Sequence, residues 1–312
     1  MNKKTYVITL VVTAGIVPIL FYIFFLDYLP PTQADETIRY IPLLDQLMVV
    51  ITAFVIKPLY MLISFSLVWI LKNARSSDLI ALRWGLLAFF IGEAFCSINY
   101  LIFHDKSILS EFLHNYGMVV SFAFIGYALQ EGLDKYVIQY SHPTKRCSFI
   151  GLCNNCIKSQ DVPCRVKQIF KFSLIILGSL AFIPLLAEVR EISYYVDIIG
   201  TPYNFIRPRV HQLFEIRYSP LLALLMFLIA FLSMHFSKEK QIPELARISV
   251  FAGIGALGFG IFRLFFNSVF AKNLAWSASW EELTEFILMI AIAYLIWLFR
   301  KALKIFSAKE SA

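Results

Sequence analysis

Runs of apolar residues, separated by short polar segments, recur along the whole chain. Most of these runs approach or exceed the roughly 20 residues that an α-helix needs to cross a bilayer. The alternation of apolar and polar residues that is typical of a membrane β-barrel does not occur. The pattern therefore predicts an all-α polytopic membrane protein with about eight transmembrane helices, near Tyr6–Leu26, Leu43–Leu71, Leu79–Phe103, Phe112–Gln130, Ile169–Ala187, Leu221–His235, Ile248–Phe270 and Leu283–Phe299.

The composition agrees with a lipid environment. Hydrophobic residues make up 59% of the chain and charged residues 16%, and the mean hydropathy is +0.71. A soluble domain has about a quarter of its residues charged. We therefore interpret the net charge of +7 as a signal of membrane topology, and expect the lipid bilayer but no nucleic acid among the partners. The first apolar run follows Lys3 and Lys4 without a small-residue cleavage pattern before Pro30, so we interpret it as an uncleaved helix.

The distribution of lysine and arginine predicts the orientation. With the N-terminus in the cytoplasm, nineteen basic residues fall on cytoplasmic segments and seven on outer segments. Short cytoplasmic loops are enriched in lysine and arginine in membrane proteins. We therefore expect a protein integral to the plasma (inner) membrane, with both termini and the 141–168 loop in the cytoplasm.

Two halves of the chain resemble each other. The segment "TAGIVPIL" in the first span resembles "LAFIPLL" in the fifth, and the third span resembles the seventh. The matched residues are separated by offsets of 166, 164, 164 and 170, and the pairs are Pro18 with Pro184, Arg83 with Arg247, Asn99 with Arg263, and Glu111 with Glu281. An even number of spans in each half makes such repeats parallel.

This internal repeat predicts the domain organisation. Residues 1–140 form a first four-helix half, and residues 169–312 form a second half that also carries an outer segment, 188–220. The cytoplasmic loop 141–168 joins the two halves and contains four of the five cysteines.

The cysteine loop has the spacing C-x5-C-x2-C-x7-C. A reducing cytoplasm disfavours disulfides, so four thiols within such a short segment predict a metal site. Lysine and arginine surround the cysteines and would offset the negative charge of four thiolates. The expected ligands are Cys147, Cys153, Cys156 and Cys164.

The loop alone leaves two cofactors open. A structural zinc site usually has two short C-x2-C pairs, and this loop has one. The spacing resembles the cluster loop of the endonuclease III family of DNA glycosylases, C-x6-C-x2-C-x5-C, which holds a [4Fe-4S] cluster. That resemblance covers the loop only, and its gaps differ by one and two residues. We favour a [4Fe-4S] cluster and keep zinc as the alternative.

Several polar residues lie inside the apolar runs, mostly toward the outer ends of the predicted spans. Ionisable residues in a bilayer are energetically costly and face the interior of the bundle. We expect Arg263 to form an ion pair with Glu285, because the seventh and eighth spans form a hairpin. Cys96 is interpreted as a packing residue. The candidate residues for interhelix pairs or an outward-facing polar pocket are Lys57, Glu93, Asn99, His114, Arg263, Glu281 and Glu285.

Two functional classes follow. The first is a membrane redox component, in which a cytoplasmic-face cluster exchanges electrons with a soluble cytoplasmic donor, with membrane redox subunits or with quinone. The second is a transporter or membrane sensor, with a ligand in the outer pocket and a structural zinc or redox-sensing loop. The sequence contains no C-x-x-C-H, Walker or G-x-G-x-x-G motif and no recognisable catalytic triad, so whether the protein is an enzyme stays open. We favour the redox class.

Overall fold

A computed structural model of the chain describes residues 2–25, 33–138, 165–187, 192–206, 209–237, 242–270 and 273–300. Within these ranges the protein is mainly helical. A π-helical turn interrupts two of the helical segments and follows α5 in a third. The elements are α1 (Lys3–Phe25), β1 (Gln33–Arg39), α2 (Leu43–Ile51), η2 (Thr52–Ile56), α3 (Lys57–Ile70), α4 (Ser77–Phe103), α5 (Ile108–Leu133), η3 (Asp134–Ile138), α6 (Arg165–Leu186), β2 (Ile192–Ile198), β3 (Thr201–Ile206), α7 (Arg209–Gln212), η4 (Leu213–Tyr218), α8 (Ser219–Phe236), α9 (Glu244–Val269) and α10 (Leu274–Leu298).

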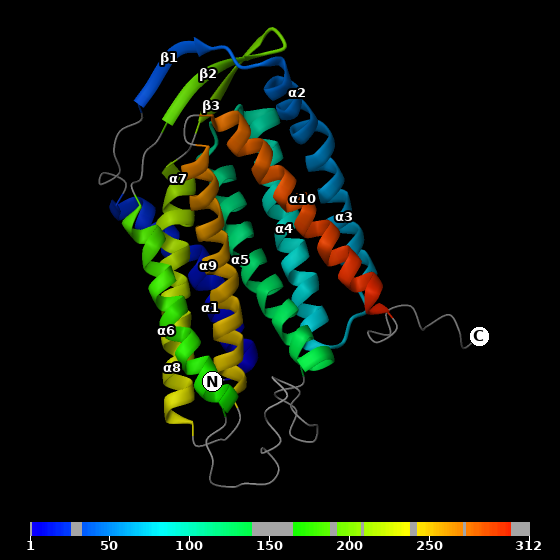
Figure 1. Cartoon of the computed structure of the whole chain (residues 1–312), viewed down its shortest axis with the longest axis vertical. Coiled ribbons are helices and arrows are strands. Elements are labelled where there is room, and N and C mark those ends of the chain that lie inside the picture. Colours follow the sequence, from blue (N-terminus) through cyan, green and yellow to red (C-terminus); the bar gives the residue numbers. More distant parts are fainter. Residues whose placement is uncertain are drawn as a thin grey trace, which may run out of the picture.

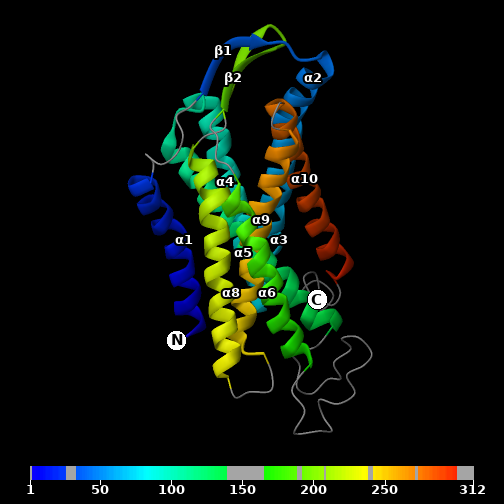
Figure 2. The same cartoon turned by 60° about the vertical axis from the view of Figure 1, so that its left-hand side comes forward.

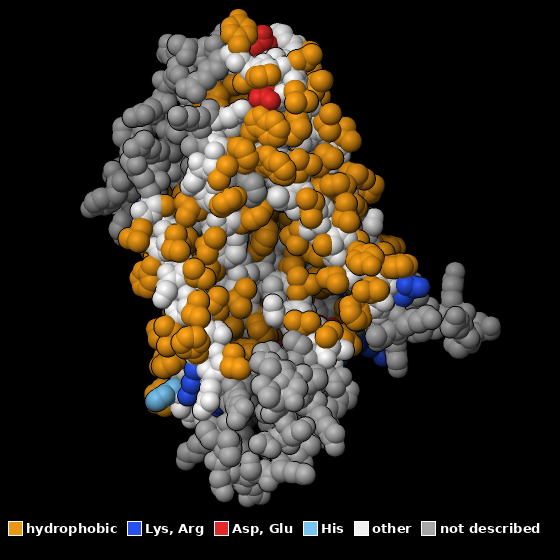
Figure 3. Space-filling view, viewed as in Figure 1, with side chains coloured by type: hydrophobic (Ala, Val, Ile, Leu, Met, Phe, Trp, Pro, Cys, Tyr) orange, Lys and Arg blue, Asp and Glu red, His pale blue; other side chains and the backbone are white. Residues whose placement is uncertain are grey.

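These elements form a helical membrane protein. Seven helical segments of the described chain are long and apolar enough to span a bilayer, counting α2–α3, α5–η3 and α7–α8 as continuous segments. The eighth long helix, α10, has 25 residues but carries three glutamates in its first half. Large hydrophobic side chains are exposed on all of these helices, and they cover the bundle face shown in Figure 3. Such a surface is suited to lipid.

The helices run alternately up and down (Figures 1 and 2). The start of α1 and the end of α10 lie at one end of the bundle, and the small sheet lies at the other, which we call the sheet end. The most buried spans are α5 and α9, which contact each other and also α4 and α8, respectively. The α10 helix contacts α2 and α3 on the opposite flank from α6 and α8.

Two close helix contacts depend on glycine. A Cβ added at Gly117 of α5 would lie 2.8 Å from the Cα of Gly92 in α4. A Cβ added at Gly255 of α9 would lie 2.1 Å from the carbonyl oxygen of Phe122 in α5. Small residues allow membrane helices to approach this closely. The first contact aligns the residues next to it, so that Glu93 of α4 lies near His114 of α5.

The sheet joins segments from both halves of the chain. β1 pairs with β2 in parallel, from Gln33 opposite Ile192 to Arg39 opposite Val196, and β2 pairs with β3 in antiparallel. Ile199 and Gly200 connect β2 to β3 with positive φ values of 51° and 78°. These strands lie in outer segments without an apolar run, so the hydrophobic pattern of the sequence does not predict them.

Side-chain contacts fix this sheet on the bundle. The backbone N–H of Leu274, at the start of α10, donates to the Tyr194 hydroxyl at 2.6 Å. The Tyr203 hydroxyl donates to Asp105, in the turn between α4 and α5, at 2.8 Å. The backbone N–H of Ile199 donates to the side chain of Gln46 in α2 at 2.9 Å. The sheet therefore covers the ends of α2, α4 and α10.

Two helices differ in extent from the sequence prediction. The predicted sixth span, Leu221–His235, is short and leaves an extension past Pro220 open. The structure extends it upstream to Arg209, where the polar residues of the helical start are buried in the bundle. The second part of the outer segment 188–220 is therefore helical. The last helix begins at Leu274 instead of Leu283. Its glutamates consequently lie in its second and third turns and do not open the helix.

Candidate functional site

A cavity of about 750 Å³ lies between α2–α3, α4 and α10, beneath the sheet. Hydrophobic side chains such as Phe65 and Phe90 form part of its wall. Its polar lining comes from helices far apart in the sequence, and includes Lys57, Cys96, Glu111, His211, Glu215 and Glu282.

Lys57 is the first cation of the site. It follows the π-helical turn η2 and precedes Pro58, and this interruption of the helix is a common feature of functional sites. Its ammonium group contacts the carboxylate of Glu93 in α4 and lies 2.9 Å from Oε1 of Glu282 in α10. The Tyr60 hydroxyl donates to Glu93 Oε2 at 2.7 Å. Three helices are thus joined by one buried group of charges.

Arg263 of α9 is the second cation. Its Nη2 atom donates to Glu285 Oε1 at 3.0 Å, so the predicted ion pair is present. Its Nη1 atom contacts Glu281, and its Nε atom lies 3.5 Å from Oε1 of Glu215 in η4. One guanidinium therefore faces three carboxylates, which its five N–H donors can serve.

A third polar group lies near the turn between α4 and α5. Asn99 donates to the carboxylate of Glu111 and accepts from the backbone N–H of Ser107 at 3.0 Å. Glu111 also contacts His211 of α7. The rings of His211 and His114 have centroids 5.5 Å apart. His114 lies within α5 and His211 within α7, so both histidines come from helices that border this region.

Carboxylates are in excess around the cavity. In the described part of the chain, the three polar groups contain two lysine or arginine cations, Lys57 and Arg263, and six glutamates: Glu93, Glu111, Glu215, Glu281, Glu282 and Glu285. The glutamates outnumber the two cations by four, or by two if both histidines are protonated. Uncompensated charge is costly where the dielectric constant is low. The arrangement therefore favours the uptake of protons or of a cation.

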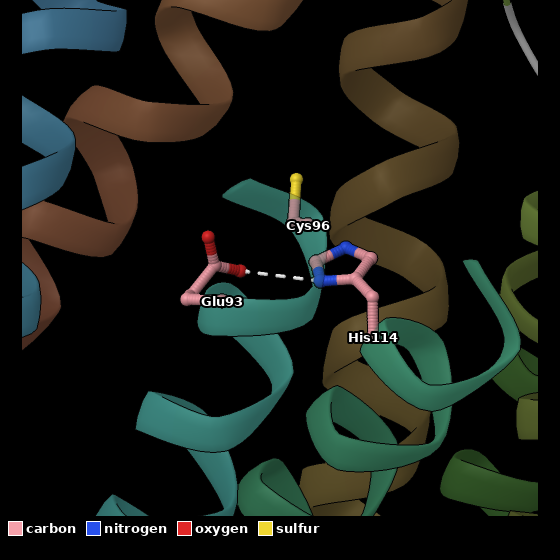
Figure 4. Close-up of side chains that lie close together, drawn as sticks. All are labelled: Glu93, Cys96 and His114. Atoms are coloured by element: carbon pink, nitrogen blue, oxygen red, sulfur yellow. Dashed lines mark ion pairs between the residues drawn. The ribbon is translucent and has the colours of Figure 1, made fainter. Parts of the chain in front are cut away.

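Two buried carboxylate oxygens can accept further hydrogen bonds or a cation. Glu93 and Glu285 are 0% and 5% exposed, and neither Oε1 of Glu93 nor Oε2 of Glu285 has a hydrogen-bond partner among the described residues. Oxygens of Glu93, Glu282 and Glu285 lie within 4.8 Å of one another. Glu93, Cys96 and His114 form a second group with the same spacing (Figure 4). Buried polar atoms are nearly always paired, so unpaired oxygens are unusual.

The rim of the cavity carries one further acid. Asp105 lies in the turn between α4 and α5, at a positive φ of 60°, and accepts the hydrogen bond from Tyr203. Burial raises the pKa of Asp105 above its ordinary value, and the hydrogen bond from Tyr203 opposes that rise. The rim therefore continues the acidic character of the interior.

The structure brings together the intramembrane residues that the sequence singled out. Lys57, Glu93 and His114 are part of one cluster, and Arg263, Glu281 and Glu285 are part of its neighbour. Asn99 belongs to the third group. Sequence reasoning missed Tyr60 and Glu215 and did not include Glu282 among the candidate pairs. It assigned Cys96 to packing, although Cys96 lines the cavity. Tyr60 could have been predicted from the sequence, because it is a polar residue one helical turn from the predicted site residue Lys57.

The four loop cysteines Cys147, Cys153, Cys156 and Cys164 lie outside the described residues. The metal site predicted for them therefore stays a prediction. Comparisons with protein-family models, with curated proteins and with solved structures find no match to this chain.

Proposed function

We propose that this membrane protein binds a cationic solute in the acidic cavity, as a transporter or a membrane sensor. The observation that carries the proposal is the excess of carboxylates, four of the six buried, around a cavity of about 750 Å³. A bound cation would compensate this negative charge and use the unpaired oxygens of Glu93 and Glu285. An intramembrane ionisable residue without full compensation is a mark of a functional site in membrane proteins.

The cavity is proposed to open to the outer face. It lies beneath the sheet, and its lining includes Tyr203 and Phe205 of β3. The excess of basic residues in the segments of the opposite end favours placing that end, with both termini, in the cytoplasm. A solute would therefore approach from the outside, between the sheet and the helices below it.

The proposed internal repeat supports a transporter or sensor fold. Asn99 and Glu111 form a pair in the first half, and the residues matched to them by sequence, Arg263 and Glu281, form a pair in the second. A π-helical turn also stands before Pro58 and before Pro220, at an offset of 162. Repeated halves place their binding sites at the interface between the repeats in many transporters. The cavity is lined from both halves.

A membrane redox function is the second candidate, and the cysteine loop is the observation that favours it. Four thiolates at the cytoplasmic face would hold a [4Fe-4S] cluster or a zinc ion. Electron exchange would involve a soluble cytoplasmic donor, redox subunits or quinone near that face. The acidic cavity lies toward the other end of the bundle, so the two features would serve separate roles.

Binding of probe cations to the detergent-purified full chain tests the first proposal. The probes are Zn²⁺, guanidinium, methylammonium and a linear diamine, each followed by its effect on the melting temperature and by calorimetry. At 100 times its dissociation constant, a bound probe stabilises the fold by about 2.7 kcal/mol. We expect at least one probe to bind and Glu282→Gln to weaken it.

The matched control is Asp78→Asn, which removes a buried carboxylate at the opposite end, where Asp78 pairs with Lys135. This variant should bind the probe as the unaltered chain does. If no probe binds, or if Glu282→Gln and Asp78→Asn bind with unchanged affinity, the proposed function is wrong.

A further inference from the structure

We propose that Glu93, Cys96 and His114 form a binding site for a divalent transition metal of the zinc class. This inference rests on the proposed function, because it names the kind of cation that the cavity takes. It is distinct from the metal site predicted for the loop cysteines, which lies outside the described residues.

The three side chains come from two adjacent helices. Glu93 and Cys96 are three residues apart in α4 and therefore lie on the same helix face, and His114 faces them from α5 (Figure 4). One ligand atom from each residue lies within 4.8 Å of the others. Ligand atoms around a tetrahedral zinc ion are about 3.3–3.8 Å apart, as follows from its bond lengths. A small movement of side chains would close the set around an ion.

The surroundings prepare His114 and Glu93 as ligands. Nδ1 of His114 lies 3.1 Å from the carbonyl oxygen of Gly92, which can only accept a hydrogen bond, so this nitrogen carries the proton. Nε2 is then the nitrogen with a lone pair for a metal, and a carbonyl behind the ring is a common support for a ligating histidine. Glu93 uses Oε2 for Lys57 and Tyr60. Its buried Oε1 lies 3.5 Å from Nδ1 of His114, the contact drawn in Figure 4, and has no hydrogen-bond partner among the described residues.

Cys96 supplies the chemical selectivity. Its sulfur lines the cavity and lies 3.5 Å from the ammonium group of Lys57. On binding a metal the thiol would lose its proton, and the thiolate and the Glu93 carboxylate would balance the two charges of the ion. A sulfur, a nitrogen and a carboxylate oxygen together suit Zn²⁺ and related ions, whereas Ca²⁺ and Mg²⁺ prefer oxygen ligands alone.

Three protein ligands leave a fourth position open. An open position is typical of zinc sites at which a ligand is exchanged, and structural zinc sites are closed by four protein ligands. The neighbouring group of Glu93, Glu282 and Glu285 offers carboxylate oxygens alone, which suit a metal of the zinc class less than a set with sulfur and nitrogen. The geometry therefore points to an ion that keeps one position for water or a solute from the cavity.

Cobalt(II) is the probe for this site, because a thiolate bound to cobalt gives an intense near-ultraviolet charge-transfer absorption. The test uses the full chain with Cys147, Cys153, Cys156 and Cys164 replaced by serine, which leaves Cys96 as the only thiol. We expect one cobalt ion per chain with this absorption, and its displacement by Zn²⁺. Cys96→Ser should abolish the absorption. His114→Ala should raise the dissociation constant by about 100-fold, since even outer-shell changes raise it about tenfold to 100-fold.

The control is His235→Ala, which removes a histidine from the end of α8 and should leave the titration unchanged. If the serine variant does not fold, the comparison uses two chains that keep the four loop cysteines, one with Cys96 and one with Cys96→Ser. The difference in absorption between these two chains is then assigned to Cys96. No difference on removing Cys96 would overturn the metal site. In that case binding of an organic cation that depends on Glu282 would leave the proposed function standing, whereas its absence would refute both.

Discussion

At the scale of single residues, the contact that we expect to be most sensitive to substitution is the one between Arg263 and its carboxylate partners. The guanidinium is 5% exposed and lies 3.0 Å from Glu285. Removing one partner of a buried ion pair leaves an uncompensated charge. We predict that Arg263→Ala lowers the free energy of unfolding by about 3 kcal/mol and that Glu285→Ala also lowers it. The double variant should recover part of the loss, measured as thermal stability in detergent.

A partly exposed ion pair provides the control for this cycle. Lys3 and Glu244 have side chains 38% and 53% exposed, and such pairs contribute about 1 kcal/mol or less. Lys3→Ala should therefore change the stability little. If the losses from Arg263→Ala and Glu285→Ala simply add, the two residues are not coupled, and Glu215 and Glu281 are the partners that matter.

Single residues also show how far the candidate site could be predicted. The energetic cost of a charge in lipid is visible in the sequence, so Lys57, Glu93 and Arg263 were identifiable without a structure. Their partners were harder to identify. Glu215 lies in a helical start that reads as a polar loop, and Cys96 is apolar enough to read as packing. Which glutamate meets which cation depends on helix neighbours, which apolar periodicity does not specify.

At the scale of elements, the contact between α5 and α9 depends on a glycine. A Cβ at Gly255 would lie 2.1 Å from the Phe122 carbonyl oxygen, so backbone atoms would have to move. We predict that Gly255→Ala separates the two helices and lowers the free energy of unfolding by about 1–3 kcal/mol, the usual effect of overpacking. The measurement is the melting temperature in detergent.

Gly258→Ala is the matched substitution in the same helix. An added Cβ at Gly258 meets no atom within 4 Å. Alanine is favoured over glycine inside a helix by about 1 kcal/mol, so this variant should be as stable as the unaltered chain or more stable. Equal losses of stability in the two variants would show that the loss comes from the substitution within α9 and not from its contact with α5.

The elements themselves were largely predictable, and the reasons for the exceptions are physical. Apolar runs predicted the positions of eight long helices because the bilayer requires long uninterrupted apolar segments. The start of the sixth span at Arg209 and of the last at Leu274 was missed because polar residues there are buried by protein instead of exposed to lipid. The strands β1 and β2 pair across about 159 residues of sequence, judged from Gln33 opposite Ile192, and no local pattern predicts such a pairing.

At the scale of the whole molecule, the first prediction concerns topology. Cysteine is introduced by Ser159→Cys in the loop and by Thr201→Cys at the β2–β3 turn, in a chain whose native cysteines are replaced by serine. An impermeant thiol reagent on intact cells should label the second position and not the first, because basic residues favour the cytoplasm for the loop. Position 159 should become labelled after lysis. Labelling at 159 without lysis would reverse the topology.

The second whole-molecule prediction concerns the cofactor of the cysteine loop. We predict that Cys147, Cys153, Cys156 and Cys164 together hold one [4Fe-4S] cluster, so protein purified without oxygen should be brown with about four irons per chain. Its absorbance should bleach on reduction. Replacing any one of the four by serine should remove most of the iron, and Cys96→Ser should not. A colourless protein with one zinc ion in the loop would favour a structural or sensing role and contradict electron transfer.

The position of α10 has a consequence for how the protein is made. This helix is synthesised after the other helices that the structure describes, yet it supplies Glu281, Glu282 and Glu285 to the cations of those earlier helices. Until α10 leaves the translation machinery, Lys57 has only Glu93 as a carboxylate partner and Arg263 only Glu215, among the contacts described. The growing chain thus holds two incompletely compensated cations in the membrane. Insertion of α10 completes their pairing, so a chain that stops before α10 would leave both cations incompletely compensated.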